Sequence, residues 1–341
     1  MQVNENIAGS LPEKKPRIDI KSFVSKYTIF IILLVMILIL SIASPVFLTG
    51  RNIVNIFTAE AGRGLLAFGI AFCIISRGID LSAGSVVAVS SVFSAALVQE
   101  LSYSTLIIPN LVYVPAWVAV LVGALLGTSF GVLNGLLIAY TKIPPFIATL
   151  GSQVIARGVA LLFTNAYPIP MLRKDFTIIG QGNMFGFLPN IVVVFLVFGV
   201  IAYVLLNWTK FGKNVYAIGG NVEAARAAGI KVERNLVAIY TWSALCASVA
   251  GVMITSRAAS GIASLGLSYE LDAIAAATVG GVSHAGGIGT IPGVFVGILV
   301  LGVINNGLLI LGVSPYLQQI IKGIIIVVAV IVDMRKTSKK A

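Results

Sequence analysis

The sequence has few charged residues. Lysine, arginine, aspartate and glutamate make up only 10% of its 341 residues, whereas a typical soluble domain carries about 25%. A chain with so few charges cannot form a water-facing surface, which excludes a soluble globular domain. Hydrophobic residues account for 58% of the sequence instead, and this composition predicts a polytopic membrane protein.

Cysteine and histidine are also scarce. Cys73 and Cys246 both lie inside apolar runs, and the one histidine, His284, has no potential metal ligand near it in the sequence. We therefore expect neither a disulfide framework nor a metal site. The glycine-rich stretch GGIGTIPG, residues 286–293, lacks the Lys-Ser/Thr pair of a phosphate-binding loop. The chain is therefore expected to hydrolyse no ATP and not to be an enzyme.

Long apolar runs, in contrast, are abundant. A helix that crosses the bilayer core needs about 20 mostly apolar residues, and its backbone must satisfy its own hydrogen bonds in lipid. The runs predict an all-α fold with about ten transmembrane helices, at 27–47, 53–75, 82–100, 112–140, 145–165, 190–207, 236–256, 271–283, 289–311 and 316–333. They form one domain, 27–333, between an N-terminal tail, 1–26, and a C-terminal tail, 334–341. The eighth helix is short and need not cross completely.

Basic residues are unevenly distributed over the expected loops. If the N-terminus is cytoplasmic, 16 of the 23 basic residues fall in cytoplasmic segments, and only Arg51, Arg173, Lys174 and Arg257 fall in exterior loops. Basic residues accumulate on the cytoplasmic side of membrane proteins, so both termini are predicted to be cytoplasmic. The net charge of +11 therefore reflects the orientation of the chain in the membrane. No nucleic-acid partner is expected.

The stretch NGLLI occurs twice, beginning at Asn134 and at Asn306. The two copies end the fourth and ninth predicted helices, which run in opposite directions, and Asp80 and Asp272 lie at corresponding helix junctions. Each copy lies beside glycines four residues apart, a spacing that lets helices pack closely in lipid. The glycines are Gly123, Gly127, Gly131, Gly135 and, in the second copy, Gly289, Gly293, Gly297. These correspondences predict an inverted repeat of helices 2–5 and 7–10; the alternative is chance similarity in a biased composition.

The longest cytoplasmic segment covers residues 208–235 and contains the stretch EAARAAG. Asn221 is the expected N-cap of a short helix, and Glu223 lies in its first turn, where the helix dipole favours a negative charge. Gly229 can end the helix. The helix is suited to docking into a cleft of another protein, although an ordinary surface helix is the alternative. The docking face would consist largely of three alanines, Ala224, Ala225 and Ala228.

Four stretches carry a family resemblance: SRGIDLSAGSVVAVSS (76–91), YAIGGNVEAARAAGI (216–230), YELDAIAAATVGGVSHAGGIGTIPG (269–293) and NNGLLILGVSPYLQQIIKG (305–323). From residue 27 to the end, the chain resembles the membrane permease subunit of bacterial ABC importers of the ribose, galactose and xylose branch. The residues that match the signature of this branch are Asp80, Gly84, Ser85, Glu270 and Asp272.

The resemblance implies a ten-helix permease of the vitamin B12 importer type, used as a homodimer in the bacterial inner membrane. It also implies a cytoplasmic ABC ATPase subunit, which would bind ATP and Mg, and a periplasmic sugar-binding protein. The chain itself would bind no cofactor, and 208–235 would be the loop that couples it to the ATPase. Ribose is the first candidate substrate, with galactose, xylose or a related sugar as alternatives.

Three basic residues, Arg63, Arg157 and Lys322, fall inside predicted helices, where a charge at the bilayer centre costs about 2.5–3.5 kcal/mol. Glu60 lies three residues before Arg63, so an ion pair along the helix is expected. The basic residues either fix helix packing or line a hydrated path for the substrate. Sugar hydroxyls need both donors and acceptors, and four amides are candidates for the same path: Asn134, Gln153, Asn305 and Asn306.

Two other classes of protein are less consistent with the sequence. An ion-coupled secondary transporter would need a carboxylate near the middle of the membrane. The acidic residues are instead expected near the ends of the spans, at Glu60, Asp80, Glu100, Glu270 and Asp272. A membrane enzyme would need a cluster of histidine, cysteine or carboxylate residues, which the sequence lacks.

Overall fold

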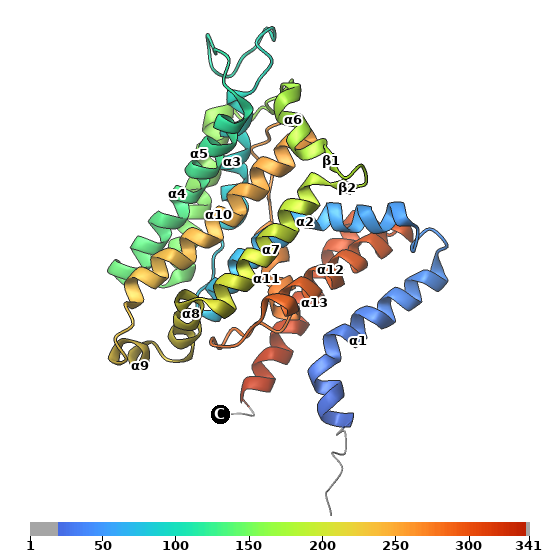
Figure 1. Cartoon of the computed structure of the whole chain (residues 1–341), viewed down its shortest axis with the longest axis vertical. Helices are drawn as coiled ribbons and strands as arrows, with labels where there is room; N and C mark the ends of the chain where they lie inside the picture. Colours follow the sequence, from blue (N-terminus) through green and yellow to red (C-terminus); the bar gives the residue numbers. More distant parts are fainter. Residues whose placement is uncertain (1–19, 339–341) are drawn as a thin grey trace, which may run out of the picture.

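The computed structural model describes the backbone of residues 20–338 and the side chains of residues 29–328, 330 and 331. Over this range the chain forms thirteen helices and one two-stranded hairpin (Figure 1). Most of the predicted N-terminal tail, 1–26, lies outside the described residues, and α1 begins earlier than the predicted first span.

The helices in chain order are α1 (Ile20–Ala43), α2 (Gly50–Ile75), α3 (Ala83–Leu97), α4 (Ala116–Thr141), α5 (Pro145–Thr164), α6 (Lys174–Gln181), α7 (Asn190–Trp208), α8 (Lys210–Gly220), α9 (Val222–Ala227), α10 (Val232–Ala258), α11 (Tyr269–Val279), α12 (Ile291–Ile310) and α13 (Pro315–Ser338). The hairpin strands, β1 (Asn183–Met184) and β2 (Leu188–Pro189), pair antiparallel between α6 and α7.

Each of the ten predicted spans has a helix in the structure: α1–α5, α7 and α10–α13. Within the described residues, six of them are long and apolar enough to cross a membrane, namely α2, α4, α5, α7, α10 and α12. In contrast, α3 and α11 have only 15 and 11 residues. At about 1.5 Å per residue, neither crosses a bilayer core of about 30 Å. The prediction of a short eighth helix is therefore confirmed, and the third is short as well.

Both short helices follow an irregular segment that enters the interior. Residues 76–82 connect α2 to α3, and residues 259–268 connect α10 to α11. Asp80 in the first segment is fully buried, and Glu270, just after the second, is only 5% exposed. The sequence placed both acidic residues near the ends of spans, and both do lie next to helix ends. Their burial, which the sequence did not predict, arises because the chain turns back into the molecule at these points.

The two ends of the molecule are built differently (Figure 1). One end carries α6, the β1–β2 hairpin and the connections 98–115 and 165–173, which bond to one another through a bridge between Gln99 and Leu172. The opposite end carries α8, α9 and the turn 283–289. We call these the α6 end and the α9 end.

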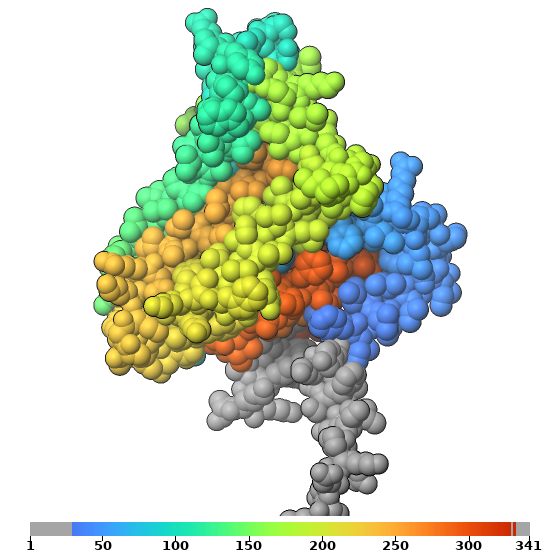
Figure 2. Space-filling model, in the orientation of Figure 1, coloured from blue at the N-terminus to red at the C-terminus, as the bar shows by residue number. Residues whose placement is uncertain are grey.

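Helix α2 lies at the centre of the bundle, and most of its residues are buried. It packs against α7, α10, α11 and α12, and Phe68 stacks on Phe195 of α7 at 5.2 Å between ring centroids. In the space-filling view, α7 lies across the near face, with α10 and α12 on either side of it (Figure 2). The elements that surround α2 are thus those that bear the polar residues described below.

The glycines of α4 lie against α10. An added Cβ at Gly127 would lie 2.2 Å from Ser90 Oγ and 2.3 Å from Ser248 Oγ, and one at Gly131 would lie 2.4 Å from Ala244 Cβ. Real side chains do not approach so closely, so this helix contact requires glycine. The predicted role of the first glycine series in close packing is confirmed.

These contacts also give the directions of the helices. Gly123 lies against Val252 near the end of α10, and Gly135 lies against Val237 near its start, so α4 and α10 are antiparallel. Helix α2 is antiparallel to both α10 and α12, as shown by the pairs Gly62–Ile254, Gly78–Tyr240, Asn52–Asn306 and Ile75–Gly289. The helices that end in the two NGLLI copies, α4 and α12, therefore run in opposite directions.

The neighbours of each helix also follow the predicted repeat, in which α2–α5 correspond to α10–α13. Helix α3 packs against α4, α5 and α10, and its counterpart α11 packs against α12, α13 and α2. Helix α4 packs on α10 as α12 packs on α2. This arrangement supports an inverted repeat, and the superposition of the two halves stays a prediction.

The second glycine series does not repeat the contacts of the first. Gly289 precedes α12 and lies against Ile75, while Gly293 and Gly297 lie against α11 at Gly280 and Ala276. The glycines of α4 instead pack on α10 and α3. The similar spacing in the sequence therefore serves different helix contacts in the two halves.

We predict that Gly131→Ala lowers the free energy of unfolding by about 1–3 kcal/mol, because the new methyl group overpacks the contact with α10. Gly158→Ala is the matched control, since no atom lies within 4 Å of a Cβ at this position of α5. Alanine favours a helix over glycine by about 1 kcal/mol, so the control should be neutral or stabilising. Thermal unfolding in detergent measures both. Equal effects of the two substitutions would contradict the packing described for α4.

Candidate functional site

The segment 208–235 contains two helices, where the sequence predicted one. Helix α8 begins after Thr209, whose Oγ1 accepts a hydrogen bond from Gly212 N at 3.2 Å. Its residues Phe211, Val215 and Ile218 face the core. The polar cap and the helical spacing of these apolar residues were the signals in the sequence for α8.

Helix α9 matches the prediction for EAARAAG at both ends. Asn221 Oδ1 accepts a hydrogen bond from Ala224 N at 3.0 Å, which confirms the N-cap. Gly229 has a φ of +81°, which confirms a left-handed residue just after the helix. Glu223 forms an ion pair with Arg226 at 3.0 Å, and Arg226 also binds Glu233 at 3.0 Å.

One of the three alanines does not lie on the predicted docking face. Ala225 is only 4% exposed and packs with Ile218 and Val232, so it anchors α9 to α8 and α10 and cannot touch another protein. Ala224 and Ala228 are exposed, as predicted. Because residues of a helix point in different directions around its axis, one alanine of the stretch faces inward. The sequence alone did not show which one.

The segment is bound firmly to the rest of the molecule at the α9 end. Arg77 Nε donates to Ala285 O at 2.6 Å, and its Nη2 donates to Gly220 O at 3.0 Å. Tyr216 OH donates to Gly289 O at 2.7 Å, and a Cβ at Gly219 would lie only 1.8 Å from Ile75 O. Helix α8 therefore contacts the end of α2 and the turn between α11 and α12, and sequence reasoning did not identify Arg77 as the link.

Asp80 lies at the centre of a buried hydrogen-bond network. Its Oδ1 accepts from Ser82 N at 2.9 Å and Ser82 Oγ at 2.6 Å, and its Oδ2 accepts from Ser243 Oγ at 2.7 Å. Asn134 Nδ2 donates to Ser82 Oγ at 2.9 Å, and Ser152 donates to Asn134 Oδ1. The network joins segment 76–82 to α4, α5 and α10.

Asn134 was predicted to line a path, and its complete burial contradicts this, whereas the same role for Asn306 stays a prediction. Asn134 is fully buried within the Asp80 network. Asn306 exchanges two hydrogen bonds of 2.9 Å with Asn52. Asn134 therefore fixes helix packing. The three other candidates, Gln153, Asn305 and Asn306, are partly exposed, and the first two lie beside carboxylates.

Arg157 and Glu270 hold the second irregular segment in place. Arg157 donates to Ala263 O, to Leu265 O at 2.9 Å and to Gly84 O at 3.2 Å. Glu270 Oε1 accepts from Gln153 Nε2 at 3.1 Å. A Cβ at Gly84 would lie 2.0 Å from Glu270 Oε2, so glycine is needed there. Arg157 thus satisfies backbone carbonyls and forms no carboxylate ion pair in the described residues.

The neighbouring signature residue Ser85 is also buried, at 1% exposure. Its Oγ makes no hydrogen bond to any residue that the structure describes. Ser85 therefore packs beside Gly84 at the start of α3 without joining the polar contacts of Arg157 and Glu270.

Arg63 and Lys322 share a second cluster of charges. The predicted pair of Arg63 with Glu60 is present at 3.0 Å. Asp272 also binds Arg63 at 3.2 Å and Lys322 at 3.2 Å. Asn305 Nδ2 donates to Glu60 Oε1 at 3.1 Å. Two acidic and two basic groups therefore balance one another between α2, α11, α12 and α13, which supports the interpretation that Arg63 and Lys322 fix helix packing.

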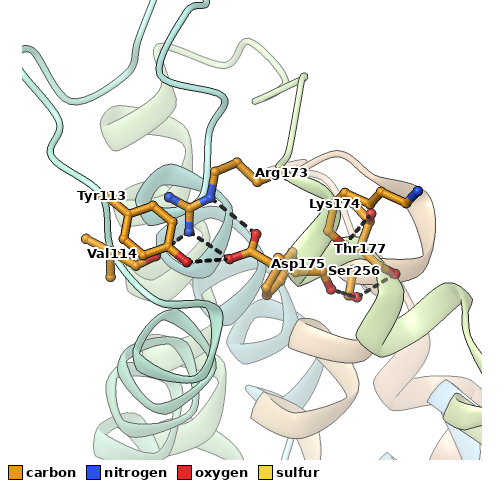
Figure 3. Close-up of polar contacts among 8 residues, drawn as sticks. Tyr113, Val114, Arg173, Lys174, Asp175, Thr177 and Ser256 are labelled. Atoms are coloured by element: carbon orange, nitrogen blue, oxygen red, sulfur yellow. Dashed lines mark hydrogen bonds and ion pairs between the residues drawn. The ribbon is translucent and has the colours of Figure 1, made fainter.

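A different set of contacts holds the α6 end together (Figure 3). The Arg173 guanidinium lies over the Tyr113 ring at 4.3 Å and binds Asp175 at 3.2 Å; it also donates to Val114 O. Ser256 Oγ donates to Phe176 O at 2.6 Å and accepts from Gly180 N at 2.7 Å. These contacts fasten connection 98–115 and α6 to the end of α10.

Comparison with known proteins shows similarity to permease components of transport systems. The model of the family described as "Branched-chain amino acid transport system / permease component" matches residues 52–330. The galactose/methyl galactoside import permease protein of Haemophilus influenzae is 40% identical over 328 residues, which cover 94% of this chain and 98% of the relative. The ribose import permease protein of Bacillus subtilis is 40% identical over 330 residues, which cover 96% of this chain and 98% of the relative.

The ribose import permease protein of Escherichia coli is 37% identical over 320 residues, which cover 93% of this chain and 96% of the relative. No solved structure gives a significant match. The family and these relatives are transport permeases rather than enzymes. The chain, with its bundle of apolar helices, therefore belongs to the family of transport-system permease components of the membrane.

Proposed function

We propose that this chain is the transmembrane subunit of an ABC importer for a monosaccharide, with ribose as the first candidate. The observation that carries the proposal is similarity over more than nine tenths of the chain, at 40% identity, to both a galactose and a ribose import permease. The family description names amino acids, whereas the relatives with this degree of identity name sugars. Equal identity to both leaves galactose as the alternative substrate.

The proposal includes three partners. A cytoplasmic ATPase, which binds ATP and Mg, docks at the α9 end. A periplasmic sugar-binding protein docks at the α6 end, and a second copy of the chain completes the pore. Both termini are then cytoplasmic, in the inner membrane of a bacterium. The excess of basic residues at the α9 end supports this orientation.

Helix α9 is the proposed contact with the ATPase. Its exposed surface is formed by the small side chains of Ala224, Ala227 and Ala228 next to Glu223, a shape that fits a cleft. Because α8 is hydrogen-bonded to Arg77 and the turn 283–289 and packs against Ile75, a displacement of α9 would move α2, α11 and α12 with it.

An ion-coupled transporter is the second candidate, and one observation favours it. Asp80 and Glu270 are buried inside the bundle, whereas the sequence argument against this class placed them near span ends. Each carboxylate is, however, bound by neutral donors within the described residues. The similarity to ABC permeases and the α9 surface favour the importer, and sugar uptake that depends on a proton or sodium gradient in place of ATP would favour the transporter.

We predict that Ala228→Trp and Ala224→Trp each reduce uptake of labelled ribose or galactose by at least about tenfold, which corresponds to about 1.4 kcal/mol of lost docking. The large ring would clash with the ATPase while leaving the fold of the permease intact. Uptake in cells that also express the ATPase and the binding protein measures the effect, and co-purification of the ATPase measures docking.

Val200→Trp is the control for these variants, since this exposed residue lies in the middle of α7, away from both the α6 end and the α9 end. It should change neither uptake nor ATPase recruitment. Ala225→Trp should behave differently from both, because it disrupts the packing of α9 and lowers the amount of folded permease. If the Ala224 and Ala228 variants both recruit the ATPase and import sugar normally, α9 does not couple the two subunits and the proposed docking at α9 is wrong.

We predict that a membrane-impermeant maleimide, added from outside, labels cysteine introduced at Tyr167 or Phe185 but not at Lys213 or Ala227. All four side chains are exposed, so accessibility depends on the side of the membrane. Cys73 and Cys246 are fully buried and contribute no background. Permeabilised cells provide the control, in which all four positions should react. Labelling of Lys213→Cys in intact cells would contradict the proposed orientation.

A further inference from the structure

A partly open cavity of about 290 Å³ lies between α2, α7 and α10, close to the α6 end. Tyr269, at the start of α11, also lines it. The volume is near the lower limit of small-molecule sites, about 300 Å³, and is therefore suited to a small ligand. Gly62 of α2 and Ile254 of α10, which lie against each other, form part of its wall.

The polar side chains around the cavity offer both donors and acceptors. Thr58, Arg63, Arg257 and Tyr269 line it together with apolar residues of α7 and α10. Arg63 Nη1 binds Glu60 and its Nε binds Asp272, while its Nη2 makes no hydrogen bond to any described residue. The nitrogens of Arg257 likewise make no ion pair within the described part of the chain.

The side chains that line the cavity suit hydroxyl groups. Arg63 and Lys322 are offset by Glu60 and Asp272, so Arg257 is the one charged lining residue without an ion pair in the described part of the chain. A guanidinium carries several N–H donors and can hold hydroxyl groups. Tyr269, whose ring already lies 5.1 Å from the Arg63 guanidinium, adds an aromatic surface with a polar end. Such a combination suits a small polyhydroxyl compound.

Arg63 also separates this cavity from a second, much smaller one. The second cavity, of about 10 Å³, is lined by Glu60, Arg63, Asp272 and Asn305, and has room for about one water molecule. The two cavities together form a line of polar side chains that leads from Arg257, at the α6 end, to Asn305 and Asp272 in the interior. Arg63 closes this line at its middle.

We infer that the larger cavity is a transient subsite for a monosaccharide inside the permease, closed on its inner side by Arg63. The inference rests on the proposed function and goes beyond it by giving the permease its own contacts with the sugar. These contacts are made by Arg63, Arg257, Tyr269 and Thr58. A sugar released at the α6 end would occupy this subsite before moving further inward.

The test uses substitutions that narrow the cavity and leave the charged residues Glu60, Arg63, Asp272 and Lys322 unchanged. Ala258→Phe and Ala59→Phe each place a ring in the cavity, since both alanines line it and are exposed. Val200→Phe is the matched control, an exposed position of α7 outside the cavity. Each permease is reconstituted in proteoliposomes with its ATPase and binding protein, and uptake of ribose and galactose is measured together with ATP hydrolysis.

The inference predicts that both cavity variants reduce the maximal uptake per ATP hydrolysed by about tenfold, a loss typical of a disturbed contact in a pocket. The half-saturating sugar concentration, which the binding protein sets, should not change, and neither should ATP hydrolysis stimulated by that protein. Unchanged stimulation also shows that the variants fold and assemble. Arg257→Gln, at the exposed rim, should lower the same ratio, whereas Val200→Phe should leave it unchanged.

Two results would overturn the inference. The first is normal uptake per ATP by both cavity variants. The second is a lipid, detected by mass spectrometry in the purified permease, that is lost in Ala258→Phe and kept in Val200→Phe while uptake stays normal. Failure of the wild-type transporter to import either sugar would be a different result, because it would refute the proposed function itself.

Discussion

The two irregular segments, 76–82 and 259–268, enter the interior, where no bulk water is present. Their backbone groups must find hydrogen-bond partners there, and the rest of the structure depends on this constraint. In lipid, irregular backbone is tolerated only where protein buries it. Arg157 meets the need for segment 259–268 by donating to the carbonyls of Ala263, Leu265 and Gly84. Asp80 does so for segment 76–82 by accepting from Ser82 N. The charged residues that are costly in a membrane are thus the ones that permit α3 and α11 to be short.

The same constraint explains why α2 is central and buried. The irregular segments and the short helices that follow them leave space on either side of α2, which α7, α10 and α12 fill. The end of α2 then meets α8 so closely that Gly219 has no room for a side chain beside Ile75. Arg77 bonds to both Gly220 and Ala285 at this place. The segment proposed to meet the ATPase is therefore continuous with the interior of the permease.

The features that depend on neighbouring residues in the sequence were predicted well. The apolar runs predicted ten helices. The N-cap at Asn221 and the left-handed Gly229 were predicted as the limits of α9, and both are present. The features that depend on tertiary contacts were not predicted. Ala225 faces inward, Asn134 bonds to Ser82, and Asp80 lies deep in the bundle, because these positions depend on elements remote in the sequence, which hydropathy does not report. The partners of Arg157 and Lys322 also come from helices remote in sequence.

We propose that α8 and α9 transmit the action of the ATPase to the core through Arg77. The ratio of sugar imported to ATP hydrolysed, measured on the reconstituted transporter, tests this directly in Arg77→Gln, with Lys142→Gln as the control because Lys142 is exposed at the end of α4, outside α8 and α9. The account predicts that Arg77→Gln keeps ATP hydrolysis but imports at least about tenfold less sugar per ATP, while the control keeps the normal ratio. A normal ratio in Arg77→Gln would contradict it.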